Sequence, residues 1–97
     1  MDYQDLYPTD EELETIEKWD IVEKGVRELI SYIKAIWWSP NWGFRFRGGY
    51  LSPSTGGWSG NESIMRALKN NLLFWTMYWR TSRRGGHYTF RIKKDIK

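Results

Sequence analysis

The stretch that decides the fold class is GFRFRGGYLS, residues 43–52. Its first half alternates apolar and basic side chains, which predicts a strand with one buried face and with Arg45 and Arg47 directed outward. The glycine pair at 48–49 is a two-residue hairpin signal, so the chain is expected to return at once as a short second strand. Apolar side chains alternate again over 87–93, and we expect this segment to complete a small antiparallel sheet.

Helical patterns lie on both sides of this hairpin. A capping box predicts the start of a short helix over residues 10–19. Asp20 is a second cap, followed by an amphipathic stripe that runs to a stop at Ser39-Pro40. The longest helix is expected over 60–82, with the glycine pair 85–86 as its stop. The predicted order is α-α-β-β-α-β, which indicates a compact α+β domain with three helices covering the sheet.

The composition excludes several classes of protein. The chain of 97 residues has the length of a single domain. It has no Cys and one His, which excludes disulfides, thiolate chemistry and metal sites built from several histidines. The acidic N-terminus and the short apolar runs predict neither a secretory signal nor a membrane span. We therefore expect a soluble, cytoplasmic protein that carries no metal and no cofactor.

Charge is divided along the chain. Residues 1–42 hold ten acids and four bases, a net charge of −6, whereas residues 43–97 hold eleven bases and two acids, a net charge of +9. Such asymmetry indicates an anionic partner for the basic half. It is equally consistent with the two halves neutralising each other within the molecule. The sequence leaves both interpretations open.

A glycine-rich loop, STGGWSGNES at 54–63, leads into the longest predicted helix. The start of a helix offers unpaired N–H groups, so the amides of residues 59–61 are candidates for binding an anion, with Arg66 and Lys69 adding charge from the next turns. The spacing matches neither a Walker loop nor a dinucleotide fingerprint. A capping box between residues 59 and 62 explains the same loop without a ligand.

Basic residues follow the same helix at its far end, where Arg83-Arg84 precede Gly85-Gly86-His87. The arginine pair suits either a phosphate or the negative end of the helix dipole. A helix of about 20 residues is about 30 Å long, so the two ends cannot both contact one small ligand, and the final strand would bridge them. Trp58 either stacks on an unpaired base or plugs its own loop. The candidate phosphate- or ligand-binding residues are Trp58, Ser59, Gly60, Asn61, Arg66, Lys69, Arg83, Arg84, His87 and Arg91.

Catalytic chemistry has few candidate residues. His87 is the only His, and Glu62 is the only acid between Glu28 and Asp95, so neither a two-His site nor a paired-carboxylate site is predicted from the basic half. We expect no enzyme activity, with a phosphodiesterase-like role for His87 as the alternative. The segment 72–79 is apolar nearly all round, which predicts either cover by the first helices or a homodimer interface.

The strings GGWSGNE and RRGGHY, with PTDEELETIEKW and IWWSPNWG upstream, resemble a family of small uncharacterised proteins of tailed bacteriophages and prophages. The resemblance covers nearly the whole chain. It implies a phage protein that acts in the bacterial host cytoplasm, and it assigns no activity, ligand or catalytic residue.

We expect a non-catalytic binding module whose basic half holds a phosphate-rich partner, with nucleic acid as the first candidate and a nucleotide as the second. The alternative is a host-directed inhibitor, for example of a defence system, that binds a bacterial protein through aromatic and arginine hot spots. In that alternative, the aromatic residues expected to bind the host protein are Trp58, Phe74 and Tyr78.

Overall fold

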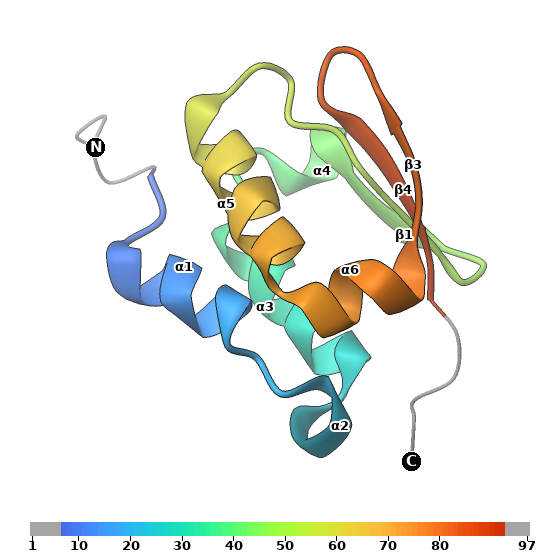
Figure 1. The fold of residues 1–97 in the computed structure, drawn as a ribbon. Helices are drawn as coiled ribbons and strands as arrows, with labels where there is room; N and C mark the ends of the chain where they lie inside the picture. The colour runs from blue at the N-terminus through green and yellow to red at the C-terminus, as the bar shows by residue number, and fades with distance from the viewer. Residues whose placement is uncertain (1–6, 93–97) are drawn as a thin grey trace.

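The computed structural model describes residues 7–92 and places one antiparallel sheet against a layer of helices (Figure 1). The predicted α+β class is confirmed. Within this range the elements are α1 (Asp10–Glu17), α2 (Ile21–Lys24), α3 (Val26–Ile36), α4 (Pro40–Gly43), β1 (Phe44–Arg47), β2 (Tyr50–Pro53), α5 (Ser59–Asn70), α6 (Leu72–Tyr78), β3 (Trp79–Arg83) and β4 (His87–Arg91).

The first helix begins as its sequence predicts. Thr9 Oγ1 accepts a hydrogen bond from the Glu12 amide at 3.1 Å, and Glu12 Oε1 accepts one from the Thr9 amide at 2.8 Å. This capping box satisfies two backbone donors that a helix start otherwise leaves unpaired. Asp20 likewise caps α2 by accepting from the amides of Val22 and Glu23.

The single second helix expected after Asp20 is wrong, because Gly25 divides it into α2 and α3. Gly25 has φ +90°, a conformation that no helix contains and that glycine adopts without steric cost. The amphipathic stripe after the break is confirmed: Val26, Leu29, Ile30 and Ile33 are buried. Helical periodicity therefore identified the buried face, although it missed the break.

The long helix expected over 60–82 is also wrong. Asn71, with φ −82° and ψ 88°, ends α5 and begins α6. The helix stops completely at Tyr78, and Trp79 starts β3, a strand that the sequence analysis did not predict. Gly85 and Gly86, at φ +86° and +78°, make the turn of the β3–β4 hairpin and are not a helix stop. Arg83 and Arg84 therefore lie in a strand and a hairpin turn, away from any helix dipole.

The sheet has the order β1-β2-β4-β3, with every neighbouring pair antiparallel. The hairpin predicted at 43–52 is confirmed, with Phe46 opposite Leu51. The helices lie on one side of the sheet in Figure 1, and no described element covers the other side. The buried core includes Ile16, Leu29, Ile33, Leu51, Ile64, Leu68, Phe74, Tyr78 and Phe90.

Among residues 7–92, no helix is both long enough and apolar enough to cross a membrane.

Candidate functional site

One face of the sheet carries basic side chains and has no helix over it. Successive side chains of a strand point to opposite faces, and Phe44, Leu51 and Phe90 point into the helical layer. Their neighbours therefore occupy the other side, which we call the open face. Its residues are Arg45, Arg47, Tyr50, Ser52, Ser54, Thr81, Arg83, His87, Thr89 and Arg91.

At one end of the open face, an aromatic ring lies between two arginines. Arg47 is opposite Tyr50 across β1 and β2, and Tyr50 is opposite Arg91 across β2 and β4. The Arg91 Nη1 donates to the Tyr50 hydroxyl at 2.9 Å, and its guanidinium lies 5.1 Å from the ring centroid. Stacking on tyrosine holds the cation at a defined place on the surface.

At the other end, Ser54, His87 and Arg83 form a second row. Ser54 faces His87, and His87 faces Arg83 in the β3–β4 ladder. The Ser54 Oγ lies 2.7 Å from His87 Nδ1. In addition, the Thr55 amide donates to the Gly86 carbonyl at 3.0 Å, so the glycine loop and the Arg-Arg-Gly-Gly turn are in contact. The expected separation of these two segments by the length of one helix is wrong, because the chain turns back at Asn71 and again at Trp79.

The charges of the open face are not neutralised by the acidic helices. The four strands carry five arginines and no carboxylate. In the described part of the chain, the one ion pair joins Lys18 to Glu14, both on the α1 side. Figure 1 shows α1 packed against α5 on the side away from the sheet. Among residues 7–92, therefore, no acidic side chain forms an ion pair with the arginines of the strands.

The predicted anion loop is used for packing. Trp58 is half-buried and lies between two rings, with its centroid 5.1 Å from that of Tyr7 and 4.9 Å from that of Trp38. Gly60 is buried directly beneath the Trp58 ring. The sequence left two roles open for Trp58, stacking on an unpaired base or filling its own loop. In the structure, its ring is held inside the loop.

The polar side chains at the start of α5 have intramolecular partners. The expected capping box of Ser59 with Glu62 is wrong: the N-cap is Trp58, and the Ser59 hydroxyl lies 2.8 Å from the Tyr7 hydroxyl. Asn61 is 2% exposed. Its side chain accepts from the Trp38 amide at 2.9 Å and donates to the Trp38 carbonyl at 3.1 Å. Its amide group thus fastens the end of α3 to α5.

Arg66 and Lys69 lie on a different surface from the open face. With Glu62, Trp75 and Tyr88 they line a hollow of about 370 Å³ between the helices and the helical side of β4. Arg83, His87 and Arg91 are on the open face, and Arg84 is exposed in the hairpin turn. The structure therefore divides the predicted binding residues among four places: the packed loop, the α5 hollow, the open face and, for Arg84, the β3–β4 turn.

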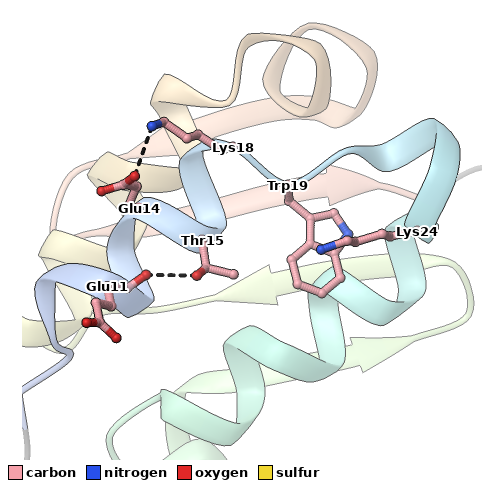
Figure 2. Close-up of a pocket in the computed structure, with 6 residues that line it drawn as sticks. All are labelled: Glu11, Glu14, Thr15, Lys18, Trp19 and Lys24. Carbon is pink, nitrogen blue, oxygen red and sulfur yellow. Dashed lines mark hydrogen bonds and ion pairs between the residues drawn. The ribbon is translucent and has the colours of Figure 1, made fainter.

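A further hollow, of about 420 Å³, lies between α1 and α2 (Figure 2). Within it, Lys18 pairs with Glu14 at 2.9 Å, and the Thr15 hydroxyl donates to the Glu11 backbone carbonyl. The hydrogen bond and charge of Lys18 lower the pKa of the Glu14 carboxyl. Lys24 lies over the Trp19 ring, 4.9 Å from its centroid. The hollow is lined by two carboxylates, of Glu11 and Glu14, and by two ammonium groups, of Lys18 and Lys24, so it has no net charge.

Catalytic and metal-binding arrangements are limited in the described residues. His87 and Ser54 have the spacing of a base and a nucleophile, but no carboxylate among residues 7–92 hydrogen-bonds the histidine ring to orient it. Over the same range, no group of three His, Asp or Glu side chains could hold a metal ion.

Of the three aromatic residues expected to bind a host protein in the alternative hypothesis, two are not on the surface. Phe74 and Tyr78 are 0% and 1% exposed and belong to the core, where Phe74 contacts Phe90. In the apolar segment 72–79, the exposed apolar side chains are instead Leu72, Leu73 and Trp79. Homodimerisation through this segment stays a prediction.

Two aromatic residues near the open face were missed as candidates. Trp42 is 68% exposed and Tyr50 is 38% exposed. Tyr50 could have been found from the strand alternation, because it falls on the same face as the arginines. The sequence around Trp42 contains no pattern that predicts its exposure, because it is one of three tryptophans around Ser39-Pro40.

No protein-family model, no curated protein and no solved structure matches this chain.

Proposed function

We propose that this protein is a non-catalytic binding module for single-stranded nucleic acid, which it holds on the open face. The observation that carries this proposal is the uncovered sheet surface on which Arg45, Arg47, Arg83 and Arg91 lie without carboxylate partners from residues 7–92. Clustered arginines on one face are the electrostatic footprint of a polyanion site.

A single strand fits this surface better than a duplex. Reading a duplex requires a helix or a narrow β-ribbon that enters the major groove, and the open face presents neither. Neighbouring strands are about 4.8 Å apart, so four strands offer a shallow platform about 15 Å wide. Platforms of this kind hold unpaired nucleotides by stacking bases on aromatic side chains while cations contact the phosphates. Tyr50, with an arginine on either side, supplies that combination.

The distribution of charge supports a polyanionic partner. The acidic residues of α1 lie on the far side of α5 from the sheet, so the molecule has one repulsive and one attractive side. A field of this shape orients an approaching polyanion and speeds its association. The phage-type family that the sequence resembles would give this module a bacterial cytoplasm in which to meet RNA and single-stranded DNA.

The test is a salt titration of binding. The affinity for a fluorescent single-stranded oligonucleotide, read by anisotropy, should fall linearly on a log–log plot with a slope of about −0.7 for each neutralised phosphate, or about −3 for four arginines. A duplex of the same length serves as the comparison and should bind more weakly. Absence of binding at low salt, or affinity that does not depend on salt, would remove the proposal.

A further inference from the structure

We infer that the hollow beside Trp42 is a pocket for one unpaired base, and that Arg45 makes guanine its preferred occupant. This inference rests on the proposed function and names a specific subsite within it. The hollow has a volume of about 230 Å³ and is lined by Trp42, Gly43, Phe44, Arg45, Ser52 and Ser54. Three of these residues, Arg45, Ser52 and Ser54, belong to the open face, so the pocket opens onto it.

The size of the pocket points to a single flat ring. Sites for drug-sized ligands have volumes of about 300–1,000 Å³, and this hollow is smaller. An unpaired base splayed from a strand needs only a ring-sized recess and an aromatic wall. The pocket also lies at the β1 edge of the open face, where a strand that crosses the sheet would enter or leave.

Trp42 is held in an exposed position by its local backbone. Ser39 adopts φ +57°, which is rare outside glycine, and its carbonyl accepts from the Trp42 amide at 3.0 Å to form the single turn of α4. The chain at Gly56 lies so close to the ring that an added Cβ would be 2.7 Å from it. One part of the indole is thus fixed against glycine while 68% of the residue is exposed. A large aromatic ring fixed at the surface is already arranged for stacking, which lowers the entropy lost on binding.

The polar wall of the pocket can read a base edge. Arg45 is exposed and has no carboxylate partner among residues 7–92. Guanine presents two neighbouring acceptors, O6 and N7, that a guanidinium contacts with two parallel hydrogen bonds, whereas adenine presents a donor beside its N7. The Ser54 hydroxyl is oriented by His87 Nδ1 at 2.7 Å and adds a fixed polar group next to the ring.

The test compares an oligothymidylate that carries one central guanine with the same strand made abasic at that position. The two strands have the same phosphates, so the difference in their affinities measures the base alone. The wild-type protein should bind the guanine strand about tenfold more tightly, the size that base–aromatic stacking reaches. In Trp42→Ala the two strands should bind alike, and Trp42→Phe should restore part of the preference. Trp79→Ala is the matched control, because Trp79 is exposed on the helical side of the sheet, and it should keep the preference.

The outcomes separate this inference from the proposed function. If the wild type binds both strands equally and salt weakens both, the open face binds nucleic acid and the base pocket is refuted. If neither strand binds at low salt, the proposed function itself is refuted.

The role of Arg45 has its own test, in which the central guanine is replaced by 7-deazaguanine, which lacks the N7 acceptor. The wild type should bind this strand more weakly than the guanine strand, and Arg45→Ala should not distinguish them. Equal binding of the two strands by the wild type would overturn the assignment of Arg45 as the reader of the base.

Discussion

At the scale of single residues, glycine 86 lets the β3–β4 hairpin lie against the glycine loop. Its carbonyl accepts from the Thr55 amide at 3.0 Å, its φ is +78°, and a Cβ at this position would overlap the Thr55 side chain. Thr55 is itself 1% exposed, so it has no room to move aside. Gly86 therefore fixes the place of Arg83 and His87 on the open face.

Gly86→Ala should lower the free energy of unfolding by about 3 kcal/mol, because the added methyl group combines a left-handed backbone with overpacking. Gly57→Ala is the matched control: Gly57 has φ +77° but nothing within 4 Å of an added Cβ. It should cost only about 1 kcal/mol. Urea denaturation followed by circular dichroism measures both values. Equal losses would show that the Thr55 contact does not position the hairpin.

At the scale of elements, the break at Asn71 lets the chain return through α6 and β3, so that the β3–β4 turn meets the glycine loop. The Asn71 side chain accepts from the Phe74 amide and so caps α6. It also donates to the carbonyls of Ile16 and Trp19 at 2.9 and 3.1 Å, which fastens the end of α1. One buried amide thus ends one helix, begins another and holds a third.

Asn71→Ala should lower the free energy of unfolding by about 2–3 kcal/mol, since it removes a cap and leaves buried carbonyls unpaired. Asn70→Ala changes the same residue type one position earlier, where the side chain is exposed, and should change stability by no more than about 0.5 kcal/mol. Thermal and urea unfolding of the two variants provide the comparison. A loss in Asn70→Ala as large as that in Asn71→Ala would contradict the assigned role.

The sequence could predict the hairpin at 43–52 because its signals are local: side-chain alternation and a glycine pair. It could not predict the turn at Asn71, because the partners that stabilise a break there, Ile16 and Trp19, come from α1. Trp75 and Trp79 are four residues apart and continued the apparent helical stripe, although their rings stack, at a centroid distance of 6.3 Å, across the junction of α6 and β3. Tertiary contacts overrode the local periodicity at this point.

At the scale of the whole molecule, the arginines of the four strands lie apart from the acidic residues of α1, which packs on α5. The sequence predicted the basic half and the outward direction of Arg45 and Arg47, and both follow from composition and alternation. It placed part of the candidate site in the glycine loop, and the structure shows that the loop's side chains pack on Tyr7 and Trp38. The polar residues that are used for packing are selected by neighbours distant in sequence. Local sequence patterns therefore could not predict them.

The most direct test of the open face compares two double variants that remove the same charge. Arg45→Ala with Arg47→Ala removes two cations from the open face, and Arg66→Ala with Lys69→Ala removes two from the α5 hollow. Single-strand binding is measured by anisotropy over a range of salt concentrations. We predict that the first pair reduces the log–log salt slope by about 1.4 and weakens binding, while the second leaves the slope unchanged. Equal effects of the two pairs, or a larger effect of the second, would contradict binding on the open face.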